Sequence, residues 1–91
     1  MEWSVDFTPD AERDLKSLPK AVRARVLARV VWLAANFDLI APLPLRAEWR
    51  GYYKLRAGDY RAVYAADYGA RVIRIEYIDH RSRVYKRRKP K

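Results

Sequence analysis

The sequence predicts an α+β domain with an N-terminal strand, an αα-hairpin and then a three- to four-stranded antiparallel sheet, in the order β-α-α-β-β-β. Two observations lead to this fold class. The first half of the chain has one alternating segment and two stretches of helical periodicity, and the second half changes to strand-like alternation between short turns. The 91 residues suffice for one core. We assign residues 1–85 to a single domain and residues 86–91 to a basic C-terminal tail.

The predicted N-terminal strand covers residues 3–7, where apolar and polar side chains alternate. A helix is expected to follow directly, because Thr8 can act as an N-cap and Pro9 suits the first helical position. This helix should end near Leu18, because Pro19 follows and a residue before proline is pushed out of the helical region.

The second predicted helix runs from about Lys20 to Asn36. Its apolar residues recur at spacings of three and four, which places them on one helix face: Val22, Val26, Val30, Leu33 and Phe37. The expected role of this face is core packing, rather than coenzyme or membrane binding. The short first helix and the long second helix should then form a hairpin that packs on a sheet.

Three strands are predicted in the second half, at Tyr52–Leu55, Tyr60–Asp67 and Arg71–Ile78. The segment before them, residues 36–45, contains two prolines and is expected to be a connection. Short turns at residues 57–59 and 68–70 imply that the three strands run antiparallel. A brief fourth element is expected at residues 83–85.

Alternation within the strands predicts which side chains share a face of the sheet. In the last strand one face should carry Ile73, Ile75 and Tyr77. Lys54 and Arg56 are two residues apart, so their strand should project both to the same side, away from Leu55. Arg61 begins the next strand, and the intervening turn should bring it close to Arg56.

The net charge of +9 lies entirely in the second half of the chain. Residues 1–45 contain six Lys/Arg and six Asp/Glu, whereas residues 46–91 contain fourteen and five. Five of these cations belong to the tail 86–91, which could be a disordered solubilising segment. The body of this half is still basic without the tail, and such an asymmetry indicates an anionic partner.

Composition excludes several kinds of site. The chain has no cysteine, which removes disulfides, thiolate nucleophiles and zinc–thiolate centres. Its one histidine cannot supply the acid and base of a two-histidine ribonuclease, and its carboxylates show no metal-binding spacing. We therefore expect neither a metal nor a cofactor. No apolar run is long enough to span a bilayer and no signal peptide is visible, so a cytoplasmic location is expected.

Cations alternate with tyrosines in two segments, residues 52–64 and 80–85. Arginine and lysine neutralise phosphates, and tyrosine rings stack on unpaired bases. If the third strand lies beside the other two, His80, Arg81 and Tyr85 can return to the surface that carries Lys54. Such a surface could hold a phosphodiester with its flanking bases. Residue type alone favours binding of nucleic acid without cutting over catalysis.

The order of these residues resembles the RelE branch of the RelE/ParE toxin superfamily. The similar segments are Tyr53-Lys54-Leu55-Arg56-x-Gly58-Asp59-Tyr60-Arg61-x-Val63-Tyr64 and His80-Arg81-x-x-Val84-Tyr85. Upstream, residues 14–23 look like the helix-turn-helix opening of that family, and Pro44-Leu45-Arg46 looks like the element before its second strand. The resemblance extends over nearly the whole chain.

The resemblance implies a toxin of a type II toxin–antitoxin pair. RelE-like members cut messenger RNA in the ribosomal A site without metal, by directing a ribose 2′-hydroxyl at the adjacent phosphate. Lys54 would activate that hydroxyl, Arg61 would stabilise charge on the phosphate, Arg81 would meet the leaving oxygen, and Tyr85 would stack on a base. Arg46, Arg56 and His80 would bind RNA. Tyr52 stands where well-known RelE proteins have a further lysine, and Arg56 or His80 could compensate.

The implied partners are messenger RNA with the surrounding ribosomal RNA, and a small RelB-like antitoxin with an acidic, partly helical segment. Two alternatives remain open. A ParE-like toxin has the same fold but inhibits DNA gyrase through protein contacts. An inactive relative would only bind RNA or a protein partner. The sequence does not give the identity of the antitoxin, the stoichiometry of the complex, the codon preference or the general base.

Overall fold

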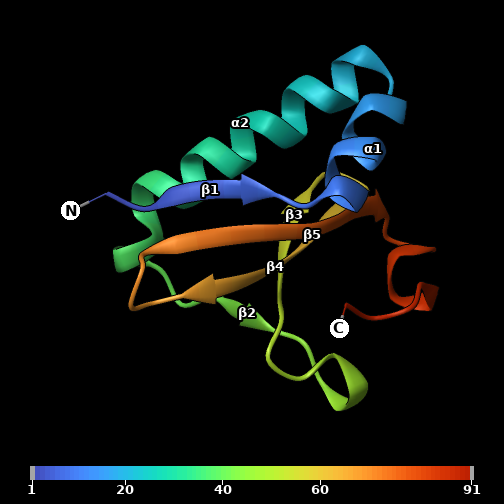
Figure 1. Cartoon of the computed structure of the whole chain (residues 1–91). Helices are drawn as coiled ribbons and strands as arrows, with labels where there is room; N and C mark the ends of the chain where they lie inside the picture. The colour runs from blue at the N-terminus through green and yellow to red at the C-terminus, as the bar shows by residue number, and fades with distance from the viewer. Residues whose placement is uncertain (1, 91) are drawn as a thin grey trace.

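The computed structural model describes residues 2–90, which form five strands, two α-helices and three short 3₁₀ turns (Figure 1). The strands are β1 (Ser4–Phe7), β2 (Leu43–Pro44), β3 (Tyr53–Ala57), β4 (Tyr60–Asp67) and β5 (Val72–His80). The helices are α1 (Pro9–Ser17) and α2 (Lys20–Asn36), and the 3₁₀ turns are Phe37–Leu39, Ala47–Trp49 and Val84–Lys86. None of the helices in this described part of the chain is long and apolar enough to cross a membrane.

The sheet has the order β1-β5-β4-β3-β2 and carries both helices on one face (Figure 1). The predicted α+β fold is therefore confirmed, with one refinement. β1 pairs in parallel with β5, from Ser4 opposite Val72 to Phe7 opposite Ile75, so the sheet is mixed. The parallel pairing is possible because the two helices and three strands lie between β1 and β5 in the chain, which gives ample length for a crossover.

Local signals place both helices close to the expected bounds. The Thr8 hydroxyl accepts a hydrogen bond from the Ala11 N–H, and Pro9 occupies the first turn of α1. α1 ends at Ser17, just before Leu18 and Pro19, because the backbone is already extended at Leu18. The Thr8 hydroxyl also donates to the Glu76 carbonyl, which fixes the start of α1 against the edge of β5.

Two predictions about connecting segments were wrong. The proline-containing segment after α2 contains a short edge strand, β2, in which Leu43 lies opposite Lys54 and Pro44 opposite Tyr53. An edge strand tolerates proline because one side of its backbone needs no sheet partner. The element expected at residues 83–85 is a 3₁₀ turn, Val84–Lys86, and not a fourth strand of the hairpin series. Val84 is fully buried, so this turn packs through a side chain and not through a ladder.

The main hydrophobic core lies between the helices and the sheet. Buried side chains come from both layers: Trp3, Ala11, Leu18, Val26, Val30, Leu33, Phe37, Leu55, Ala57, Ala62, Tyr64, Ile73, Ile75 and Ile78. The periodic face predicted for α2 supplies Val26, Val30 and Leu33, which confirms its core role. Burial raises the pKa of Tyr64, at the centre of this core, beyond its ordinary value.

A β-bulge in β5 overturns one expectation about its faces. Tyr64 lies opposite Ile75 and Val63 lies opposite Tyr77, so Glu76 is an extra residue without a partner in β4. Ile75 belongs to the main core, but Tyr77 belongs to a second cluster on the other face of the sheet. Tyr77 therefore does not share a face with Ile75, because the bulge shifts the alternation by one residue.

The second cluster lies on the sheet face that carries no helix, which we call the open face. Its buried members are Trp49, Val63, Tyr77 and Val84, with Leu45, Tyr52 and Tyr85 packed around them. The rings of Tyr52, Tyr77 and Tyr85 all meet Trp49 edge-on, at centroid distances of 6.2 to 6.3 Å. This small core holds the 3₁₀ turn Val84–Lys86 against the sheet.

Candidate functional site

Lys54, Arg56 and Arg61 form a row of cations on the open face. Leu55, between the first two, is buried in the main core, so β3 projects Lys54 and Arg56 to the opposite side as expected. Arg61 lies directly across from Arg56 in the β3–β4 pair. Within residues 2–90 none of the carboxylates is in ion-pair distance of these three cations. An anionic ligand would therefore relieve the repulsion between them.

The Arg61 side chain is held at the β3–β4 turn. Its Nη1 atom donates to the carbonyl oxygens of Gly58 and Tyr60, both at 2.8 Å. Gly58 occupies this turn with a φ of 61°, a left-handed conformation that glycine adopts without strain. The turn geometry thus fixes one cation of the row, whereas Lys54 and Arg56 extend from a regular strand.

Tyr85 lies beside this row, on the 3₁₀ turn. Its ring contacts Trp49 edge-on at 6.3 Å, and its hydroxyl is buried with no hydrogen-bond partner among the described residues. Burial raises the pKa of Tyr85, and the nearby charges of Arg61 and Arg56 lower it in part. Tyr85 therefore lies close to the cationic row. Tyr85 also lines a hollow of about 270 Å³, together with Pro44, Leu45, Arg46, Trp49 and Lys54.

Arg81 lies at the end of the cationic row nearest the β3–β4 turn. Its backbone N–H donates to the Asp59 carbonyl at 2.8 Å, and its Nε atom is 3.9 Å from Asp59 Oδ1. Both side chains are largely exposed, so this ion pair is weak and leaves Arg81 able to turn toward a ligand.

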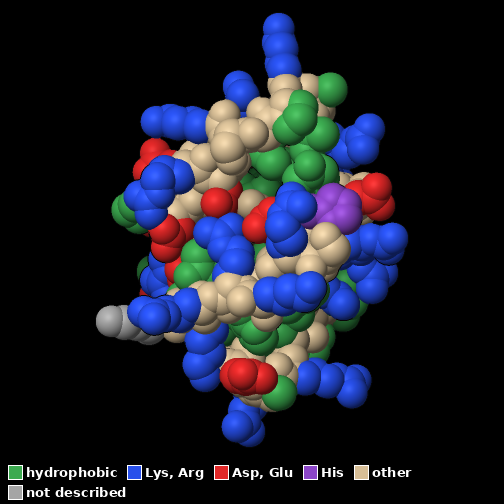
Figure 2. All heavy atoms as spheres, turned by 90° about the vertical axis from the view of Figure 1, so that its right-hand side faces the viewer, with side chains coloured by type: hydrophobic (Ala, Val, Ile, Leu, Met, Phe, Trp, Pro, Cys, Tyr) green, Lys and Arg blue, Asp and Glu red, His purple; other side chains and the backbone are tan. Residues whose placement is uncertain are grey.

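His80 is placed differently from the other predicted residues. It lies opposite Tyr60, and the two rings meet edge-on at 5.5 Å. Tyr60 packs against the main core, so the His80 side chain belongs to the helix side of the sheet edge and not to the open face. Its Nδ1 atom lies 2.8 Å from the Ser82 hydroxyl. In Figure 2 this single histidine has lysine or arginine side chains on one side and an acidic side chain on the other.

The structure thus brings Arg46, Lys54, Arg56, Arg61 and Tyr85 together, with Arg81 at one end and His80 on the neighbouring face. Sequence reasoning missed Trp49, which forms the floor beside Tyr85, and Asp59, which holds the Arg81 backbone. No local pattern singles out either residue. Among residues 2–90, no three histidine, cysteine or carboxylate side chains gather closely enough to hold a metal ion.

This arrangement can bind a phosphodiester and a base at once. The cationic row would neutralise phosphate charge, and the hollow beside it is lined by Tyr85, whose ring could stack on a base. Guanidinium groups can also stabilise negative charge that develops on a phosphate during a reaction. The geometry therefore favours single-stranded nucleic acid as the ligand of the open face.

Comparisons with known proteins agree with one another. A family model described as the ParE toxin of the type II toxin–antitoxin system parDE matches residues 5–85. The toxin RelG of Mycobacterium tuberculosis is 38% identical over 91 residues, which cover 96% of this chain and 100% of RelG.

Solved structures show the same fold. The toxin–antitoxin complex RelBE2 of M. tuberculosis contains a chain that is 36% identical, with a TM-score of 0.68 and coverage of 88% of this chain and 99% of the other. The archaeal RelE–RelB complex of Pyrococcus horikoshii contains a similar chain at 27% identity, with a TM-score of 0.71 and coverage of 92% and 100%.

Proposed function

Because the chain belongs to the RelE/ParE superfamily of type II toxin–antitoxin toxins, we propose that it is an endoribonuclease that cleaves messenger RNA in the ribosomal A site. The observation that carries this proposal is the row of Lys54, Arg56 and Arg61 beside the Tyr85 ring on the open face. The matched family model has a ParE description, so membership alone does not decide between cleavage and gyrase inhibition. The site is the feature that favours cleavage.

In the proposed reaction the ribose O2′ attacks the adjacent phosphorus. The bond from phosphorus to O5′ breaks, which leaves a 2′,3′-cyclic phosphate on one fragment and a 5′-hydroxyl on the other. The 2′-hydroxyl proton passes to a base on the toxin, and the O5′ atom gains a proton as it leaves. The protein must therefore orient the ribose, stabilise the phosphate and serve both oxygens.

Four residues would share these tasks. Lys54, which lines the hollow together with Tyr85, would activate the 2′-hydroxyl. Arg61, whose guanidinium is fixed at the turn, would stabilise charge on the phosphate oxygens. Arg81 would meet the leaving oxygen, since its side chain is free to rotate toward the row. Tyr85 would stack on a base and align the strand for attack.

Tyr52 does not join the cationic row. Its ring packs against Trp49, and its hydroxyl lies 3.5 Å from the Pro90 carbonyl. The residue that stands in place of the second lysine of known RelE proteins therefore has a packing role in this chain. We assign the general base to Lys54, with Arg56 as its cationic neighbour.

The proposed partners are messenger RNA, ribosomal RNA and an antitoxin. Arg46 and Arg56 border the hollow or the row and would contact RNA, and His80 would contact RNA from the adjacent face. Two of the similar solved structures are toxin–antitoxin complexes, which supports a RelB-like antitoxin for this chain. A toxin that acts on ribosomes would work in the cytoplasm.

Cleavage of a defined message on purified ribosomes tests the proposal. Wild-type toxin should cut within the A-site codon and leave 2′,3′-cyclic phosphate ends. Arg81→Ala and Tyr85→Ala should abolish cutting without a change in circular dichroism. Lys16→Ala, an exposed cation on α1, is the matched control and should cut like the wild type. Full activity of both site variants would show that the residues are assigned wrongly.

Gyrase inhibition is the second candidate, because the matched family model describes a ParE toxin. A supercoiling assay with purified gyrase separates the two functions directly. Inhibition of gyrase at stoichiometric toxin, with intact messages on ribosomes, would replace the cleavage proposal by the ParE-like one.

A further inference from the structure

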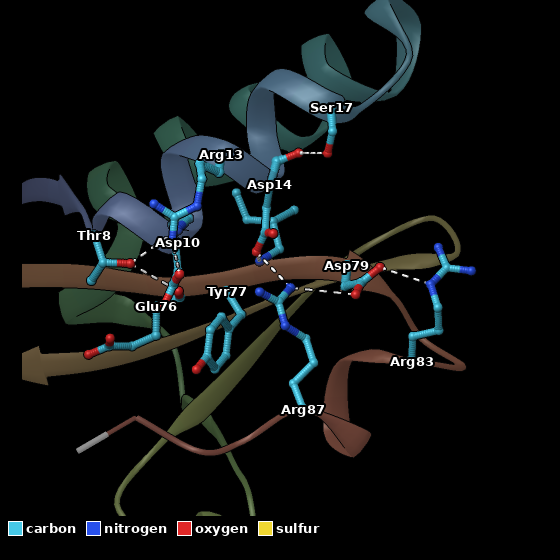
Figure 3. Close-up of polar contacts among 12 residues, drawn as sticks. Thr8, Asp10, Arg13, Asp14, Ser17, Glu76, Tyr77, Asp79, Arg83 and Arg87 are labelled. Carbon is cyan, nitrogen blue, oxygen red and sulfur yellow. Dashed lines mark hydrogen bonds and ion pairs between the residues drawn. The ribbon is translucent and has the colours of Figure 1, made fainter.

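The basic tail does not leave the domain after Tyr85. Arg87 returns to the protein body, where its Nη1 atom lies 2.8 Å from Asp14 Oδ2 on α1 and 3.5 Å from Asp79 Oδ2 on β5 (Figure 3). Its guanidinium also lies over the Tyr77 ring at 4.1 Å. One side chain thus joins a helix, a strand and the open-face cluster.

These contacts differ from an ordinary surface ion pair. The Arg87 side chain is 27% exposed, and the side chains of Asp14 and Asp79 are 16% and 22% exposed. Asp14 Oδ2 accepts a second hydrogen bond, from the Ile78 N–H at 2.9 Å, so its position is fixed independently of Arg87. Asp79 is likewise held by Arg83, whose Nε atom lies 3.2 Å from Asp79 Oδ1. Arg87 therefore binds to a pair of carboxylates, Asp14 and Asp79, that other contacts already hold in place; together with the Tyr77 ring we call them the seat of Arg87.

Backbone contacts continue the attachment beyond Arg87. The Tyr77 hydroxyl donates to the Arg88 carbonyl at 2.6 Å, and the Tyr52 hydroxyl lies 3.5 Å from the Pro90 carbonyl. In both contacts the tail contributes a backbone carbonyl oxygen and not a side chain. The side chain of Arg88 itself is exposed. The tail is thus held by one particular side chain, that of Arg87, and by its backbone.

The attachment closes the loop that carries Tyr85. The loop begins where the Arg81 N–H meets the Asp59 carbonyl, and it ends in the 3₁₀ turn, where the Arg87 N–H lies 3.4 Å from the Val84 carbonyl. Arg87 is two residues beyond Tyr85, so its seat fixes the chain direction just after the ring. The Tyr85 hydroxyl has no hydrogen-bond partner among residues 2–90, so no polar contact of its own holds the ring in place. Apart from its packing against Trp49, the ring depends for its position on the residues on either side of it in the sequence.

We propose that Arg87 is a positioning residue for Tyr85. Its seat on Asp14, Asp79 and Tyr77 holds the loop 81–87 closed, and this keeps the Tyr85 ring at the wall of the hollow beside Lys54. The catalytic consequence rests on the proposed RNA cleavage, whereas the ordering of the loop does not. The tail is therefore part of the site and not only a solubilising segment.

Arg87→Met is the variant that tests the idea, because it keeps an apolar side chain of similar length over Tyr77 and removes the guanidinium. Arg88→Met is the matched control, since it removes the same charge one residue further on. On programmed ribosomes, Arg87→Met should lower the maximal cleavage rate by at least about tenfold. The ribosome concentration for half-maximal rate should equal that of Arg88→Met. Arg87→Lys should lie between the two, because it keeps a charge but loses the planar fork.

Hydrogen exchange separates this inference from the function on which it rests. The Lys86 N–H, bonded to the Arg83 carbonyl at 3.0 Å, should exchange at least about tenfold faster in Arg87→Met than in Arg88→Met. Arg87→Met should melt at a lower temperature than Arg88→Met, because Asp14 and Asp79 lose the guanidinium that pairs with them. Equal exchange in both variants, or equal cleavage by both, would overturn the positioning role. Absence of cleavage by the wild type would instead refute the proposed function, and the exchange result would still decide whether Arg87 orders the loop.

Discussion

Replacement of Val84 by alanine should open the loop that carries Tyr85 and leave the sheet folded. Val84 is 0% exposed and packs with Trp49, Val63 and Tyr77 on the open face. The change deletes two carbons, and their transfer to water alone costs about 1.6 kcal/mol at about 0.8 per carbon. A cavity term adds to this, so the total should lie between the usual Ile→Val and Leu→Ala costs, at about 2–3 kcal/mol.

The cost of Val84→Ala should appear as local opening, because this turn is joined to the sheet by side chains and not by a ladder. A cost of about 2–3 kcal/mol raises the population of the open loop roughly 30- to 150-fold. The Lys86 N–H reports this opening through its bond to the Arg83 carbonyl. Its exchange rate should rise by that factor, whereas exchange in β4 should change little.

Two other valines provide the controls for this experiment. Val63 is also 0% exposed but lies within β4, so Val63→Ala should lower the global free energy of unfolding in urea by about 2–3 kcal/mol. Val31 is 67% exposed on α2, and Val31→Ala should change the global free energy of unfolding by less than about 0.5 kcal/mol. If Val84→Ala lowered global stability as much as Val63→Ala without faster exchange at Lys86, the turn would be part of the main cooperative unit.

Three further outcomes are expected. Tyr85→Phe should cleave RNA within a few-fold of the wild type and unfold no more easily, because the lost hydroxyl is buried and has no hydrogen-bond partner in the described range 2–90. A loss of cleavage as large as that of Tyr85→Ala would show that the hydroxyl contacts the RNA. The binding of a short single-stranded RNA, measured by fluorescence anisotropy, should weaken as salt is added. If Lys54, Arg56 and Arg61 each contact one phosphate, the logarithm of the binding constant should fall against the logarithm of the salt concentration with a slope of about −2, and Arg56→Ala should make this slope shallower by about 0.7. A binding constant that does not depend on salt would show that these residues make no phosphate contacts. Hydrogen bonds from Trp3 and then Arg71 hold the pKa of Asp38 below its ordinary value. The ionised Asp38 therefore stabilises the fold above about pH 4, and this contribution is lost as the pH falls through the lowered folded pKa. In urea unfolding, the deficit of Asp38→Asn relative to wild type should be largest near neutral pH and should shrink in acid; a deficit that does not vary with pH would contradict this.

Local signals in the sequence were sufficient for the helices and the hairpins. The Thr8–Pro9 start, the Pro19 stop and the apolar period of α2 act over a few residues, and each is visible in the chain itself. The shared face of Lys54 and Arg56 follows from strand geometry in the same way. The row of cations could therefore be predicted before the fold was known.

Features that depend on distant partners could not be predicted. The seat of Arg87 is formed by Asp14, 73 residues earlier, and nothing distinguishes this arginine from its neighbours in the basic tail. The parallel pairing of β1 with β5 is a similar case. The face of the sheet on which Tyr77 lies depends on the bulge in β5, and the alternation of apolar and polar residues in this strand does not indicate where that bulge occurs. These contacts are tertiary, and local propensity carries no information about them.

The bulge in β5 has a consequence for how this chain can vary in length. Glu76 and Tyr77 both lie on the open face, so removal of Glu76 would leave Ile75 and Ile78 in the main core and Tyr77 in its present cluster. Opposite β4, the shortened strand would simply form a regular ladder, with the loss of the Glu76 contacts to Thr8 and Arg74. An extra residue elsewhere in β5 would exchange the faces of all the residues beyond it. Position 76 is thus a point where a chain of this fold can lose one residue and still present the same side chains on the open face.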